Sequence, residues 1–295
     1  MYCGVSLPVT ESSAGVQVPI LAPVEEWERG FTVVLAPLDD DGPTERQLTR
    51  LADIARIDEA AARAILASRL SLPLVRVSTD EEAGLVTRLL GEAGFGTTIL
   101  DDHTLELRER SRRVRELRFR EDALDLLVLW GDWVTVARDS IQIVVEGRMI
   151  DTTVEILEGS GRKRGTLDVQ DTSQYFQESY AIDVYAGSID ESFRLKPDIF
   201  DYTCLGIVPS PMLEANVAEL SDRLRQWVGS SRYDNSYRQV SKLIESAWPP
   251  SSRVHSDGQR RRGDFKKYTR SSVTTESMTQ FTRYSRMRFA LTTGA

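Results

Sequence analysis

The clearest hydrophobic pattern of the chain lies in residues 31–100. Alternating apolar residues predict a buried strand at FTVVL, and apolar residues three, four and seven positions apart then predict two short helices. A strand around 74–77 follows, then a helix that begins with a capping box of Thr79 and Glu82, and finally a strand at 97–100. The pattern therefore predicts one small α/β domain with the order strand–helix–helix–strand–helix–strand.

From about Phe119 to Ile207 the apolar residues alternate with a period of two, which is typical of strands. The predicted strands are Ala123–Leu129, Trp133–Arg138, Ile141–Glu146, Thr152–Leu157, Thr166–Val169, Tyr180–Tyr185 and Ser192–Lys196, separated by turn signals such as WGDW, EGR and GSGRKRG. A helix with one apolar stripe begins at Pro211, and a second helical pattern ends at Pro249. This part is predicted to be a β domain followed by helices.

The last part of the chain differs in composition from everything before it. Residues 251–275 are basic, rich in serine and poor in aliphatic residues, which predicts a disordered linker. The final segment ESMTQFTRYSRMRFAL predicts a helix with Phe281 and Tyr284 on its apolar face. Such a helix docks on its own protein or on a partner, and contact with a membrane surface or a nucleic acid is the alternative.

These patterns predict the α+β fold class, with the small domain followed by an antiparallel, barrel-like β domain and its C-terminal helix. The segments are an irregular leader (1–28), the small α/β domain (29–104), a charged linker (105–118), the β domain with its helix (119–230), a further helix (231–248) and a basic, partly disordered tail with a possible terminal helix (249–295).

The small domain resembles a known family in its element order and in the segments FTVVL, IDEAAARAIL, TDEEAGLVTRLLGEAG and TTIL. It is similar to the C-terminal domain of the bacterial ribosomal stalk protein, and its opening also resembles the N-degron adaptor of the Clp protease, which has the same fold. The first resemblance implies recruitment of translation factors by basic residues on the first two helices. Here those helices also carry Asp53, Asp58 and Glu59, which removes much of that basic surface.

The β domain, with about seven short strands and then an amphipathic helix, resembles the pleckstrin-homology type of barrel. Members that bind phosphoinositides have basic residues in the loop between the first two strands. The corresponding loop here, Trp130–Gly131–Asp132–Trp133, has no cation. The resemblance therefore implies binding of a peptide or protein rather than of a lipid headgroup.

The sequence predicts no catalytic, metal-binding or cofactor-binding residues. It has two histidines and two cysteines, and Cys3 and Cys204 have neither the spacing of a metal site nor that of a disulfide framework. The glycine-rich segments GEAGFG and EGSGRKRG lack the strand–loop–helix context of a phosphate loop. An enzyme site assembled between the domains, recruiting Asp39, His103 or Cys204, is the remaining catalytic hypothesis.

The charge of the chain is unevenly distributed. The net charge is −8, and the segment from Pro249 onward has ten Lys and Arg against three acidic residues, 10 − 3 = +7, which leaves −15 for residues 1–248. An acidic body does not favour nucleic acid, whereas a basic tail does. No apolar run reaches the roughly 18–20 residues that span a bilayer, so we expect a cytoplasmic protein.

The leading hypothesis is a non-enzymatic protein-interaction or adaptor protein with an unidentified protein partner. The candidate partner-binding residues are basic or aromatic: Arg162, Lys163, Arg164, Tyr175, Phe176, Arg260, Arg261, Arg262, Lys266, Lys267, Phe281 and Tyr284. The alternative is a nucleic-acid or ribosome-associated factor that uses the basic tail.

Overall fold

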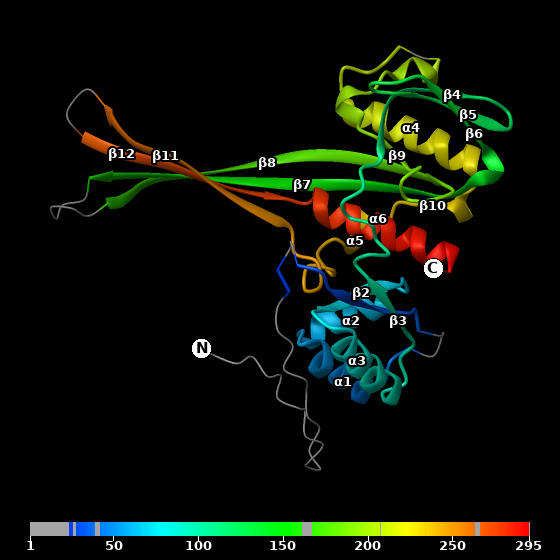
Figure 1. Cartoon of the computed structure of the whole chain (residues 1–295). Helices are drawn as coiled ribbons and strands as arrows, with labels where there is room; N and C mark the ends of the chain where they lie inside the picture. The colour runs from blue at the N-terminus through cyan, green and yellow to red at the C-terminus, as the bar shows by residue number, and fades with distance from the viewer. Residues whose placement is uncertain are drawn as a thin grey trace, which may run out of the picture.

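The small domain, in the lower part of Figure 1, has the predicted order of elements. The computed structural model describes residues 24–25, 28–38, 42–160, 167–206, 208–262 and 266–294. The elements of the small domain are β1 (Phe31–Leu35), α1 (Glu45–Ala55), α2 (Glu59–Ala67), β2 (Leu72–Val77), α3 (Asp80–Glu92) and β3 (Thr97–Asp101). The strands form an antiparallel sheet in the order β2-β1-β3. The predicted capping box is confirmed, because the Thr79 hydroxyl accepts from the backbone N–H of Glu82.

A larger mixed sheet makes up most of the remaining structure. Its strands are β4 (Arg112–Phe119), β5 (Ala123–Val128), β6 (Trp133–Ala137), β7 (Ile141–Ser160), β8 (Leu167–Ala186), β9 (Phe193–Leu195), β10 (Tyr233–Asp234), β11 (Ser251–Arg262) and β12 (Lys266–Glu276). They follow the order β11-β12-β7-β8-β9-β4-β5-β6, with β10 beside β7. The α+β class is confirmed. In the described residues the sheet is open, with β11 and β6 at its two ends, so it does not close into the expected barrel.

Helix α4 (Leu213–Val228) covers one face of the larger sheet. Its buried residues Leu220, Leu224 and Val228 share a core with Val144 of β7 and Ile182 of β8. The apolar stripe predicted for this helix is therefore the face that packs on the sheet.

Strands β7 and β8 are each continuous where the sequence predicted two separate strands. The expected break in β7 lay at EGR, which contains Gly147. This glycine is paired with Ala181 inside the sheet, and a Cβ atom built on it would lie 2.4 Å from Cδ2 of Phe281. Gly147 is therefore required for the close approach of a helix to the strand, not for a turn.

Residues 251–275, expected to be disordered, form most of the hairpin of β11 and β12 in the described residues. Strand β12 pairs with β7 from Thr152↔Thr275 to Gly159↔Tyr268, and β11 pairs with β12. The segment lacks the aliphatic residues of a core strand, so its sequence has no strong strand signal. Strand β7, which lies about a hundred residues earlier, supplies backbone hydrogen bonds to β12, and β12 supplies them to β11.

Helix α6 (Met278–Thr293) lies between the larger sheet and the small domain (Figure 1). It packs on β7 together with the short helix α5 (Tyr237–Val240). Three buried carboxylates from different parts of the chain contact its side chains. Asp102 pairs with Arg283 at 3.4 Å, Asp183 accepts from Ser285 at 2.8 Å, and Asp234 accepts from Tyr284 at 3.1 Å. The terminal helix thus fastens the two parts of the molecule together.

Candidate interaction surface

Four strands extend beyond the body of the molecule as a long ribbon, at the left of Figure 1. We call this ribbon the arm, and define it by 150–160 of β7, 167–179 of β8, and the strands β11 and β12. Twenty residues in each of β7 and β8 correspond to roughly 65 Å of strand at about 3.3 Å per residue. Helices α4 and α6 cover only the first part of β7 and the last part of β8, so the arm presents both of its faces to solvent.

One face of the arm is uncharged in its middle part. Every second residue of a strand points to the same face, and the register shows which residues of the four strands share it. We call it the uncharged face: Ile150, Thr152, Val154, Ile156, Thr172, Gln174, Phe176, Ser252, Val254, Ser256, Ser271, Val273 and Thr275. Val254, Val273 and Val154 are paired in one row across three strands. Phe176 is 68% exposed, Val254 75% and Ile150 56%.

The opposite face of the arm carries charged side chains, and two ion pairs form on it. Arg270 on β12 donates to Glu155 on β7 at 2.6 Å, and Arg253 lies 3.4 Å from Glu276. The two faces of one ribbon therefore differ sharply in polarity. An exposed strand face of this kind, with large apolar side chains and no charge, is typical of a surface that another molecule covers.

The uncharged face ends in a charged group where the arm meets α4. Arg148 is 2.7 Å from Glu178 and 3.1 Å from Glu214, and the hydroxyl of Tyr180 donates to Glu178 at 2.8 Å. The hydrogen bond from Arg148 lowers the pKa of Glu178, and burial raises the pKa of Tyr180 to about 12. The two carboxylate side chains are 42% and 58% exposed, against 21% for Arg148. The more accessible members of this group are therefore acidic.

Of the candidate residues from the sequence, Tyr175 and Phe176 lie on the arm and are exposed. They are neighbours on β8, so they point to opposite faces, Phe176 opposite Thr152 and Tyr175 opposite Thr153. Their exposed fractions, 55% and 68%, are similar. The structure therefore provides one aromatic residue on each face, which makes them a matched pair for substitution.

The basic candidates fall at the far end of the arm. Arg260, Arg261 and Arg262 end β11, and Lys266 and Lys267 begin β12, with Arg261 paired to Lys267. The predicted basic tail is thus carried on a hairpin rather than on a disordered linker. Residues 162–164, the remaining basic candidates, lie outside the described residues.

Phe281 and Tyr284 are not available to a partner, which corrects their assignment as binding residues. Both side chains have no exposed surface. Phe281 packs edge-on against the ring of Tyr237, with centroids 5.1 Å apart, and the Tyr284 hydroxyl donates to buried Asp234. The apolar face of α6 docks on its own chain.

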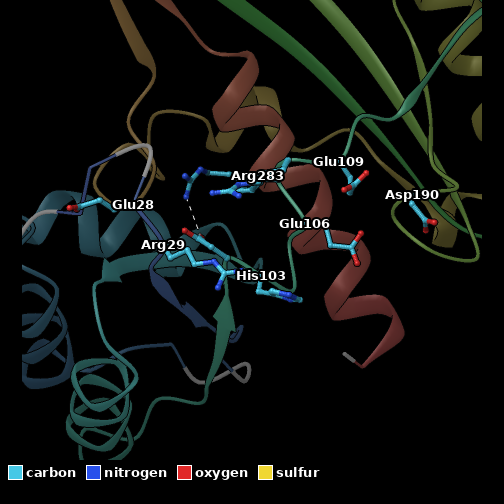
Figure 2. A pocket seen from close by; sticks show the side chains of 10 residues that line it. Glu28, Arg29, His103, Glu106, Glu109, Asp190 and Arg283 are labelled. Carbon is cyan, nitrogen blue, oxygen red and sulfur yellow. Dashed lines mark hydrogen bonds and ion pairs between the residues drawn. The ribbon is translucent and has the colours of Figure 1, made fainter.

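A cavity of about 850 Å³ lies between the small domain and α6. Figure 2 shows Arg283 reaching from α6 toward the small domain, and His103, Glu106 and Glu109 also line the cavity. Asp102 in its wall also pairs with Arg76 at 2.5 Å and is buried. His103 is exposed, and its backbone N–H donates to Asp101 in a local turn. The buried carboxylate is thus engaged by two arginines rather than by the histidine.

The cysteine singled out from the sequence, Cys204, is partly buried. Burial raises the pKa of its thiol to about 11, so the nucleophilic thiolate is scarce near neutral pH. Within the described ranges, no group of three or more His, Cys, Asp or Glu side chains is arranged to hold a metal ion.

Several residues of the uncharged face were not identified from the sequence. Val254 and Val273 are isolated apolar residues in a segment expected to be disordered, where they give no signal, and Ile150 falls in the expected break between two strands. Only the register of the four strands shows that these residues share one exposed face. The alternation TTVEI on β7 was the one sequence feature that marked this face.

Comparison with known proteins does not assign the chain to a family: no family model, curated protein or solved structure matches it. In the part of the chain that the structure describes, no helix is both long enough and apolar enough to cross a membrane.

Proposed function

We propose that the chain is a non-enzymatic protein-interaction or adaptor protein of the cytoplasm, and that the uncharged face of the arm is its binding surface. The observation that supports this function is the contrast between the two faces of one ribbon. One face exposes Phe176, Val254 and Ile150 without a charge among them, while the other carries charged side chains, including the ion pairs Arg270–Glu155 and Arg253–Glu276. Covering the apolar face removes apolar area from water, which favours association.

The small domain and the sheet that carries α4 act in this proposal as the rigid support of the arm. The buried contacts of α6 with Asp102 and Asp183 hold both parts to the base of β7 and β8. A rigid base positions the arm and reduces the entropy lost when it binds.

Affinity capture from lysate of the source organism tests the proposal, with the full chain and the variants Phe176→Asp and Tyr175→Asp as baits. Phe176→Asp places a charge on the uncharged face, whereas Tyr175→Asp places the same charge on the opposite face at the neighbouring position. We expect proteins captured by the wild type to be kept by Tyr175→Asp and lost with Phe176→Asp. Equal capture by both variants, or no capture by the wild type, contradicts the proposal.

A second function, binding of a nucleic acid or the ribosome, is favoured by one observation. The strand ends at the far end of a projecting hairpin, 260–262 and 266–267, consist of arginine and lysine, and a basic segment of this kind favours binding to phosphates. Replacing Arg260, Arg261 and Arg262 by serine should then abolish binding of RNA or DNA and reduce its salt dependence. Replacement of the same three residues by lysine, which keeps the charge, should preserve most of the binding.

A further inference from the structure

The uncharged face has a composition that fits a second protein surface. Serine, threonine and glutamine alternate there with valine, isoleucine and phenylalanine. Polar groups of this kind lose hydrogen bonds in hydrocarbon but can keep them against another strand face. Two such faces pack about 10 Å apart with interdigitating side chains, as in β-sandwiches.

Because the described residues of this face carry no charge, two copies of the face can pack against each other. In a two-fold dimer the same patch contributes to both sides, so any net charge on it would repel its own copy. The row of Val154, Val254 and Val273 lies in the middle of the face. A two-fold axis along this row would bring each valine near its counterpart.

The charged group at the base of the face determines how two arms align. Arg148, with the exposed carboxylates of Glu178 and Glu214 around it, stands six positions before Val154 on β7. A parallel alignment would bring the exposed carboxylates of the two bases together, whereas an antiparallel alignment keeps them at opposite ends of the dimer.

The area of the face is enough for a weak dimer. Four strands at about 4.8 Å spacing are about 19 Å wide, and the uncharged stretch from Ile150 to Ile156 is about 23 Å long at about 3.3 Å per residue. Each copy would cover roughly 450 Å², or about 900 Å² in total, which lies in the range of weak, transient interfaces.

We propose that two copies of this chain associate through the uncharged faces of their arms in an antiparallel, two-fold arrangement. This inference rests on the proposed function and names the partner of the same surface. The expected dissociation constant is in the micromolar range, roughly 1–100 µM, because the interface is small.

Sedimentation equilibrium of the purified full chain tests the dimer. The wild type and Tyr175→Asp should pass from monomer to dimer across that concentration range, and Phe176→Asp should associate at least tenfold more weakly. Both substituted side chains are exposed, so the melting temperatures should match that of the wild type. A wild type that stays monomeric, or equal association of the two variants, overturns the inference.

Substitutions at Val254, which is 75% exposed, test the two-fold alignment. Val254→Glu and Val254→Lys should each associate more weakly than the wild type, because like charges meet near the axis, and an equimolar mixture should regain the dimer. A mixture no stronger than either variant alone rejects the antiparallel arrangement.

The two proposals fail in different ways. If the purified chain is monomeric while Phe176→Asp still abolishes capture of another protein from lysate, the uncharged face is a binding surface for a different partner. The inference of a second copy then falls and the proposed function stands.

Discussion

Replacing Gly147 by alanine is the most direct test of how α6 is seated on β7. The added methyl group would lie 2.4 Å from Cδ2, 2.5 Å from Cε2 and 2.9 Å from Cγ of Phe281. Carbon atoms in ordinary contact are about 3.5–4.0 Å apart, so the ring or the helix has to move by about 1 Å.

Phe281 has little freedom to make that movement. The ring of Tyr237 packs on it with centroids 5.1 Å apart, and the guanidinium of Arg194 lies 5.4 Å from its centroid. Arg194 also donates to Thr282 and to Asp183, which fixes the helix to the strand beneath it. Overpacking in a core costs about 1–3 kcal/mol, and the lower backbone entropy of alanine returns roughly 0.5–1 kcal/mol. We expect the free energy of unfolding to fall by about 1–2 kcal/mol, because the ring is held on both sides and cannot easily move away from the methyl group.

Guanidinium denaturation followed by far-UV circular dichroism and tryptophan fluorescence measures this loss. Gly84→Ala is the matched control. Gly84 lies inside α3, nothing is within 4 Å of the added methyl group, and its φ is not in the left-handed region. Alanine should stabilise that helix by about 0.5–1 kcal/mol. A Gly147→Ala variant as stable as the wild type, or a shift of stability in the same direction by both substitutions, would show that Gly147 is not needed for the seating of α6.

Three further predictions concern buried groups. Asp183→Asn leaves the buried guanidinium of Arg194 without its carboxylate, which lies at 2.6 Å. The free energy of unfolding, measured by denaturant titration, should fall by about 3–5 kcal/mol. The double variant with Arg194→Met should recover part of that loss. Burial raises the pKa of the Cys204 thiol from 9.0 to about 11, so in a Cys3→Ser background its alkylation by iodoacetamide at pH 8 should be at least tenfold slower in the folded chain than in urea. Because the folded pKa is the higher one, the stability that the neutral thiol contributes is present below pH 9 and is lost as the pH rises toward 11. Arg286→Met removes the donor to the carbonyls of Leu105 and Glu109 and should speed amide hydrogen exchange in 105–110, measured by mass spectrometry; unchanged exchange there would show that the arginine does not hold this segment.

The elements of the small domain were predicted from the sequence more completely than those of the larger sheet. In the small domain each element carries its own signal, such as the capping box of α3 and the apolar alternation of β1, and its elements follow one another closely. The resemblance of this domain to the ribosomal stalk and Clp adaptor family, and that of the β domain to pleckstrin-homology barrels, stay predictions.

The arm was missed because its strands depend on distant partners. Residues 251–262 and 266–276 are polar enough to suggest disorder. They become strands because β7 offers β12 an edge to pair with and β12 then pairs with β11. Gly147 was taken for part of a turn for a related reason, since the ring that requires a glycine there lies 134 positions later, 281 − 147.

By itself, the sequence determined the α+β class, the order of elements in the small domain, the stripe of α4 and the apolar character of the last helix. Tertiary structure alone decided that this helix is buried, that the basic segment lies on a projecting hairpin, and that Phe176 and Val254 share an uncharged face while Tyr175 lies on the other. The physical reason is that local periodicity records which side of an element is apolar, whereas strand register and the choice of partner are settled by contacts between residues far apart in the chain.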